Sequence, residues 1–277
     1  MKPNELQADA AIRVFARENG VDLVGYSAMT EQTYLRGDCA QHLLHQGYRQ
    51  AITLACSISV SACELLFKQE DPGFLFYFTQ HTKSRAEQLE QAAQKLCIQI
   101  ESLGYRAFLV PGLGTAYHDG GCPTILSHIT QARLAGLGTM GDSGMLLTPQ
   151  FGPRVRLATV LTDCPLPVPE MLLGDLCLHC GACAAICPAG SITPGRHFDS
   201  EHPERYYTDK LACARYRDGN KEKYGSRFCN LCMAACPVGR NAHCGGGKKN
   251  QPQKIPKKKG GFQAHSVLMQ ISSKQEV

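Results

Sequence analysis

The run Cys177-Leu-His-Cys180-Gly-Ala-Cys183-Ala-Ala-Ile-Cys187-Pro188 has the spacing C-x2-C-x2-C-x3-C-P. This spacing is typical of a ligand run for [4Fe–4S] clusters. Its two-residue spacers let successive thiolates converge on neighbouring irons of one cube. The last cysteine follows about one helical turn later, and in two-cluster proteins it binds the other cluster. Four thiolates also suit tetrahedral zinc, so a zinc knot stays the alternative, although zinc sites usually pair two separated C-x2-C units.

A second run, Cys229-Asn-Leu-Cys232-Met-Ala-Ala-Cys236-Pro237, has the same ending but lacks one member of the close triplet. The upstream Cys213 is the natural replacement. Exchange of the distal cysteines then completes two sets of four thiols, which predicts two [4Fe–4S] clusters that pass single electrons in sequence. The first cluster is predicted to bind Cys177, Cys180, Cys183 and Cys236, and the second Cys187, Cys213, Cys229 and Cys232.

Seven of the fifteen cysteines fall outside these sets. Cys56, Cys63 and Cys97 lie in apolar contexts and are predicted to be core residues. Cys122, beside Pro123 in a Gly-rich loop, is a spare thiol without an assigned role. Cys244 follows the second run closely and is a surplus ligand, a reactive thiol or an idle residue.

The composition is that of a folded chain with reduced thiols. Among 277 residues, 43% are hydrophobic and 19% are charged, which excludes wholesale disorder. An odd cysteine count fits poorly with a fully paired disulfide framework. We find no secretory signal and no apolar run long enough to cross a membrane. A cytoplasmic protein without a membrane span is therefore expected.

The net charge of +5 is distributed unevenly along the chain. Residues 245–277 carry seven lysines and one glutamate, a net charge of +6 that leaves −1 for residues 1–244. This tail is rich in Gly, Lys, Gln and Pro, which predicts a flexible, solvated segment. Such a tail either steers the protein toward an anionic partner or merely keeps it in solution. The body gives no reason to expect a nucleic-acid surface.

Periodicity predicts an α+β fold in three parts. We expect a cofactor-binding-like α/β module over residues 1–170, a ferredoxin-like double-cluster domain over 171–244 and a basic tail over 245–277. Within the first part, helices are predicted over 5–19 and 84–103, and strands over 21–27, 51–60, 105–112 and 155–163.

The stretch RLAGLGTMGDSGMLLTPQFGPRVRLATVLTD, over residues 133–163, precedes the two cysteine runs. Together these features resemble epoxyqueuosine reductases, especially their short forms, and reductive dehalogenases. The resemblance implies a nitroreductase-like N-terminal module that holds cobalamin, with two clusters that feed it electrons for reductive removal of an oxygen or a halogen. It also implies that Gly136, Gly138 and Gly141 lie in the cofactor-binding turn. A flavin in this module, or no cofactor at all, stays an alternative.

The chain departs from the family pattern near the implied site. Thr139 stands where the family commonly has Trp, and Asp142 stands where a Lys is usual. The family's catalytic Asp precedes an Ala-Pro by two residues, whereas Asp119 lies one place earlier before Cys122-Pro123. Asp119 and His128 are the candidate catalytic proton donors. Their alternatives are a turn residue for Asp119 and a partly buried helix residue for His128.

The leading interpretation is an iron–sulfur oxidoreductase acting on a small or nucleoside-like substrate, served by a low-potential donor of ferredoxin or flavodoxin type. Epoxyqueuosine reductases that act on transfer RNA carry a helical-repeat domain after the second cluster, where this chain has the basic tail. We therefore expect no nucleic-acid partner. The alternatives are a ferredoxin-like electron carrier, or redox subunit, without a cofactor of its own, and an RNA-binding protein with structural clusters.

Overall fold

The structure is a computed structural model that describes most of the first 240 residues. The described ranges are 3–33, 37–67, 72–110, 112, 125–193, 208–224, 227 and 229–240. Asp119, Cys122, Cys244 and the basic tail lie outside these ranges, so their roles stay predictions.

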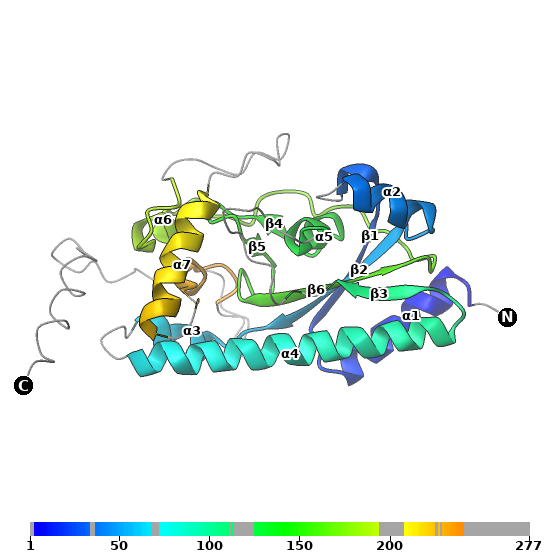
Figure 1. Cartoon of the computed structure of the whole chain (residues 1–277), viewed down its shortest axis with the longest axis horizontal. Coiled ribbons are helices and arrows are strands. Elements are labelled where there is room, and N and C mark those ends of the chain that lie inside the picture. The colour runs from blue at the N-terminus through cyan, green and yellow to red at the C-terminus, as the bar shows by residue number, and fades with distance from the viewer. Residues whose placement is uncertain are drawn as a thin grey trace, which may run out of the picture.

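A four-stranded antiparallel sheet with the order β1-β2-β6-β3 forms the centre of the N-terminal part (Figure 1). Strand β6 pairs with both β2 and β3, although about a hundred residues separate it from β2. Alternate side chains along each strand face opposite sides of the sheet, so each strand contributes to two cores. The strands are β1 (Leu23–Ala28), β2 (Gln50–Ser57), β3 (Ala107–Val110) and β6 (Val155–Thr162).

One face of the sheet is covered by two amphipathic helices, α1 (Glu5–Glu18) and the long α4 (Pro72–Ser102). Asn4 begins α1 with a capping box, because its side chain accepts from the Gln7 N–H while the Gln7 side chain accepts from the Asn4 N–H. The core on this side includes Ile12, Leu54 and Leu96, all at most 1% exposed. The predicted helices and strands of this region are confirmed with two differences. Helix α4 begins twelve residues earlier than the predicted helix, and β2 ends at Ser57, three residues before the predicted end at Val60, which begins a short helix.

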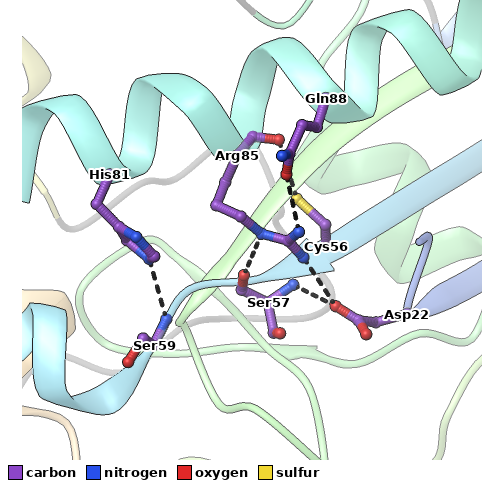
Figure 2. Close-up of polar contacts among 7 residues, drawn as sticks. All are labelled: Asp22, Cys56, Ser57, Ser59, His81, Arg85 and Gln88. Carbon is purple, nitrogen blue, oxygen red and sulfur yellow. Dashed lines mark hydrogen bonds and ion pairs between the residues drawn. The ribbon is translucent and has the colours of Figure 1, made fainter. Parts of the chain in front are cut away.

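Polar contacts fasten α4 to one end of the sheet (Figure 2). Arg85 donates from Nε to the Ser57 carbonyl oxygen at 3.1 Å and from Nη2 to Asp22 at 3.4 Å. Asp22 also accepts from the Ser57 N–H at 2.7 Å, and the Cys56 thiol donates to the Arg85 carbonyl oxygen at 3.3 Å. The guanidinium therefore ties the end of β2 to the helix and to the residue that precedes β1.

The other face of the sheet is covered by α5 (His128–Leu134). The N-cap Ser127 accepts from the Thr130 N–H, and a hydrogen bond of 2.7 Å joins Ser27 to Gln131 beneath the helix. Gly25 allows the close approach, since a Cβ there would lie 2.8 Å from the Ala135 carbonyl oxygen. Residues 128–134, just before the glycines at 136, 138, 141 and 144, thus form a helix that packs directly on β1.

The remaining elements lead to the cysteine runs, which gather at one end of the sheet (Figure 1). A third core joins Ile58, Leu66 and Phe78 of the N-terminal part to Leu231 and Met233 of the second cysteine run. The elements are η1 (Glu31–Thr33), α2 (Gly37–His45), α3 (Val60–Glu64), η2 (Leu65–Phe67), β4 (Thr139–Met140), β5 (Leu146–Leu147), α6 (Ala182–Ile186), α7 (Lys210–Tyr224) and α8 (Leu231–Ala235).

The mixed helix-and-strand architecture is confirmed, whereas the nitroreductase-like description and the three domain boundaries stay predictions. Among the described residues, no helix is both long enough and apolar enough to cross a membrane.

Gly25→Ala tests the packing of α5 on β1. The added methyl group would press against backbone of the α5 C-terminus, so we expect the free energy of unfolding to fall by about 1–3 kcal/mol. Gly219→Ala is the control, because a Cβ on that exposed helical glycine meets no atom within 4 Å. Urea denaturation under anaerobic conditions measures both variants. Equal stability of Gly25→Ala and the parent would contradict the close contact.

Candidate metal centre

The two cysteine runs fold in the same way. In each, a residue with left-handed backbone, Gly181 (φ 70°) or Asn230 (φ 56°), follows a cysteine and begins a one-turn helix. Gly and Asn are the residues that adopt this conformation most readily. Each helix, α6 or α8, ends at a Cys-Pro pair, and the two helices contact each other. The last cysteine of each run is thereby carried one helical turn away from its C-x2-C segment.

Four thiols of the first predicted set lie around one cavity. The pKa of the Cys236 thiol is raised to about 11, mainly by burial and in part by the neighbouring thiols of Cys177 and Cys180. Burial likewise raises the pKa of Cys183, with additional contributions from Cys177 and Cys180. The last cysteine of the second run thus lies with the triplet of the first run. The cysteines that line the cavity are Cys177, Cys180, Cys183 and Cys236.

The second predicted set is also brought together. The pKa of Cys229 is raised to about 11, mainly by burial and in part by the thiols of Cys213 and Cys187. The pKa of Cys232 is raised first by burial and then by the thiols of Cys229, Cys213 and Cys187. The Cys232 thiol also lies 3.8 Å from the Met145 sulfur. The last cysteine of the first run is therefore located among thiols of the second.

Cys187 and Cys213 are joined through a short polar bridge. The Cys187 sulfur lies 3.2 Å from the Ser191 hydroxyl, and the Asp209 N–H donates to the Ser191 carbonyl oxygen at 2.7 Å. The Asp209 carboxylate accepts from the Ala212 N–H at 2.9 Å, at the start of α7. Helix α7 thus carries Cys213 on its first turn. This cysteine takes the place of the third member that the C-x2-C segment of the second run lacks.

The two groups of thiols are neighbours. Helices α6 and α8 contact each other, and Cys183 of the first group lies close enough to raise the pKa of Cys232 in the second. Adjacent groups of four thiols suit two clusters that exchange single electrons. Zinc would occupy one tetrahedral group equally well on ligand type alone. The ligand roles of the individual cysteines stay predictions.

An imidazole between two carboxylates lies beside the first group, which the sequence reasoning missed. His179 contacts Asp142 through Nδ1 at 3.0 Å and Asp175 through Nε2 at 2.8 Å. The hydrogen bond with Asp142 is the main cause that raises the pKa of His179. Ligand atoms of Asp142, Cys177 and His179 lie within 4.8 Å of one another. The only sequence signal was the departure at Asp142, whose partner in the chain could not be read from spacing.

The glycines predicted to bind a cofactor pack against the chain itself. A Cβ on Gly138 would lie 2.1 Å from the Leu147 carbonyl oxygen, and one on Gly141 would lie 3.0 Å from the Leu147 side chain. Gly136 has a left-handed backbone (φ 70°), and a Cβ there would lie 3.0 Å from the Glu170 carbonyl oxygen. Close packing of the chain therefore accounts for glycine at these three positions. That these glycines contact a cofactor stays a prediction.

The remaining site predictions concern the N-terminal module. His128, at the start of α5, is partly buried with Nδ1 2.8 Å from the Thr159 hydroxyl on β6. Thr139, which stands at the family's Trp position, accepts a hydrogen bond from the Leu176 N–H at 3.1 Å. Asp119 lies outside the described residues, so the structure does not relate it to His128.

The cysteine region matches a known domain. Residues 176–239 match the family model described as a 4Fe-4S double cluster binding domain. These residues are similar to a double-cluster domain. The matched residues include both cysteine runs and Cys213, which supports the prediction of two [4Fe–4S] clusters in this region.

Relatives of two kinds resemble the chain. A tetrachloroethene reductive dehalogenase from Desulfitobacterium hafniense is 32% identical over 157 residues, which cover 53% of this chain and 26% of the relative. An epoxyqueuosine reductase from Bacillus anthracis is 33% identical over 116 residues, which cover 40% of this chain and 29% of the relative. The chain thus spans less than a third of either relative's length. The resemblance to both groups is confirmed.

Solved structures resemble the fold. A reductive dehalogenase structure, described as suggesting a mechanism for B12-dependent dehalogenation, superposes with a TM-score of 0.63 at 18% identity. The match covers 88% of this chain and 34% of the dehalogenase chain. The likeness therefore extends over the N-terminal part as well as the cysteine region.

Cys213→Ala tests the second thiol group. Because Cys213 is its only member outside the two runs, we expect loss of one cluster and retention of the other. Iron analysis after anaerobic purification should fall from about eight to about four irons per chain. Cys97→Ala is the control, since Cys97 lies in the core with α1 and α4 and should leave the iron content unchanged. Retention of both clusters in Cys213→Ala would show that another thiol completes the set.

The predicted core cysteines are buried, which confirms their assignment: Cys56 and Cys63 are each 2% exposed and Cys97 is 3% exposed. Burial raises the pKa of Cys63 to about 11 and that of Cys97 to about 12. Both are therefore protonated, unreactive thiols at pH 8.

Alkylation with iodoacetamide, followed by mass spectrometry, checks this assignment. At pH 8 we expect Cys97 in the native protein to react roughly a hundredfold more slowly than in urea. Below the raised pKa, the thiolate fraction increases about tenfold per pH unit, so native labelling should accelerate as the pH rises toward 10. Equal rates in native and unfolded protein would contradict the burial.

Proposed function

We propose that this chain is an iron–sulfur oxidoreductase in which two [4Fe–4S] clusters relay electrons to a cofactor in the N-terminal module. The cofactor we propose is cobalamin, and the reaction is a reductive removal of oxygen or halogen from a small or nucleoside-like substrate. The observation that carries the proposal is the pair of adjacent groups of four thiols, each completed by the last cysteine of the other run.

The donor set suits iron–sulfur cubes. We assign Cys177, Cys180, Cys183 and Cys236 to the first cluster and Cys187, Cys213, Cys229 and Cys232 to the second. Backbone N–H groups favour the thiolate forms, since hydrogen bonds from Asp142 and His179 lower the pKa of Cys177 and one from Leu231 lowers that of Cys229, in each case against the larger effect of burial. Such hydrogen bonds are among the factors that set cluster potentials.

Cobalamin is supported by the likeness to reductive dehalogenases, one of which is described as B12-dependent. When bound, it would supply a strongly reducing metal centre that protein side chains lack. Its binding is not supported by Gly136, Gly138 and Gly141, because the protein's own atoms fill the space on their side-chain side. This region offers a corrin ring no cradle on that side.

The proton required by a reductive removal is assigned to His128 or Asp119. His128 has a fixed orientation, because Thr159 holds its Nδ1 atom. The Thr159 hydroxyl is itself buried in the sheet face beneath α5. His128→Gln with an unchanged iron content and reduced turnover would separate proton donation from cluster binding.

A ferredoxin-like electron carrier is the second candidate. The filled glycine turn favours it, as does the exposed position of Cys180 beside the first cavity, where a partner could approach closely. In this case the N-terminal module serves as a docking unit without a cofactor. A low-potential donor of ferredoxin or flavodoxin type would serve either function.

Metal and cofactor analysis distinguishes these functions. The protein is purified anaerobically from cells supplied with cobalamin, and iron, cobalt, zinc and flavin are quantified. For the oxidoreductase we expect about eight irons and one cobalt per chain, together with a corrinoid absorption spectrum.

The metal content of the purified protein decides between the two functions. About eight irons with neither cobalt nor flavin would favour the carrier. Stoichiometric zinc in place of iron would overturn both functions, since neither operates without one-electron centres.

A further inference from the structure

One arginine of the N-terminal part reaches into the second cysteine run. Arg154 directly precedes β6 and is 1% exposed. Its Nη1 atom donates to the carbonyl oxygens of Cys236 at 2.9 Å and Met233 at 3.4 Å, and Nη2 donates to that of Val238. These hydrogen bonds hold the backbone on both sides of Cys236, the cysteine that completes the first group.

Backbone packing brings this arginine to that position. A Cβ on Gly152 (φ 55°) would lie 2.0 Å from the Val238 carbonyl oxygen. A Cβ on Gly239 (φ 67°) would lie 2.1 Å from the Gly152 nitrogen. Only glycines permit such a contact, so the turn before β6 and the chain after Cys236 are directly apposed.

The charge of Arg154 lacks a carboxylate partner among the described residues. Neutral carbonyl oxygens accept its hydrogen bonds, while its Nε atom finds no acceptor in the described part of the chain. Its electrostatic neighbours are the thiols of Cys236 and Cys63 and the cationic Arg240. A buried cation is costly unless an anion lies nearby. An anionic cluster bound through Cys236 would supply that anion.

We propose that Arg154 is a positioning residue for the first cluster, which holds the Cys236–Val238 segment in place and raises the cluster's reduction potential through its charge. The inference rests on the proposed pair of clusters. A [4Fe–4S]²⁺ cube with four thiolates carries a charge of −2, and reduction makes it more negative. A nearby cation therefore stabilises the reduced form more than the oxidised form.

The second group offers a matched control. Arg217 lies one turn after Cys213 on α7 and donates from Nε to the Arg227 carbonyl oxygen at 2.6 Å. It lowers the pKa of Cys213 and of Cys229, although burial dominates both. Replacing Arg217 removes a cation beside the second group and leaves Arg154 in place.

Redox titration monitored by electron paramagnetic resonance tests the proposal on the full chain. The proteins are the parent, Arg154→Met, Arg154→Lys and Arg217→Met, each analysed for iron. In Arg154→Met we expect the first cluster to be reduced at a lower potential. Its oxidised-to-reduced ratio at the parent's midpoint potential should rise about tenfold, or about 59 mV for one electron. Arg154→Lys should retain most of the parent's potential, and Arg217→Met should shift only the other cluster.

The four proteins distinguish an effect of the Arg154 charge from a distorted Cys236–Val238 segment and from loss of a cluster. If Arg154→Met loses the first cluster, Arg154→Lys decides, because a retained cluster at the parent's potential supports the role of charge. Equal shifts in the Lys and Met variants, or no shift in a fully loaded Met variant, would overturn the proposal. A parent with fewer than two clusters would overturn the proposed function itself, which the iron analysis reveals before any titration.

Discussion

Each cysteine run contributes its last thiol to the group formed by the other run, and the rest of the C-terminal half depends on this exchange. It requires two short helices to lie against each other, with a left-handed residue at the start of each and a Cys-Pro pair at the end. It also requires one more thiol from elsewhere in the chain, because the second run has only two cysteines in its C-x2-C segment. Helix α7 supplies Cys213, and the bridge from Ser191 to Asp209 fixes where that helix begins. Neither group of thiols is complete without chain segments far apart in the sequence.

Burial opposes the charges that this region must hold. It raises the pKa of the thiols and lowers that of the Arg154 guanidinium, so both kinds of group are less easily ionised than in water. Bringing opposite charges together offsets this cost, and loaded clusters would change the electrostatics of the whole molecule. Two clusters at −2 each would bring residues 1–244 from about −1 to about −5, with a +6 tail following. The mildly basic net charge thus describes neither part of the chain.

Local patterns predicted the local structure well. The Asn4 capping box, the strand around Leu54 and the cysteine spacings each depend on residues within a few positions, so α1, β2 and the two runs could be identified from the sequence. The two-residue strands β4 and β5 are too short to show periodicity, and α5 was hidden among glycines whose role is close packing. The roles of Asp142 and Arg154 could not be predicted, because their partners His179 and Cys236 lie 37 and 82 positions further along the chain.

The exchange of the last cysteines also orders events during synthesis. Cys177, Cys180 and Cys183 leave the ribosome more than fifty residues before Cys236, so the first group stays one thiol short until residue 236 has been added. In the folded chain Cys177 lies near Asp142 and His179, and thiolate, carboxylate and imidazole are all zinc ligands. Arrival of Cys236 completes the four-thiol set and, through Arg154, joins it to the strand at the centre of the sheet. A chain that ended before residue 236 would therefore lack both the fourth thiol of the first group and the hydrogen bond that Arg154 donates to Cys236.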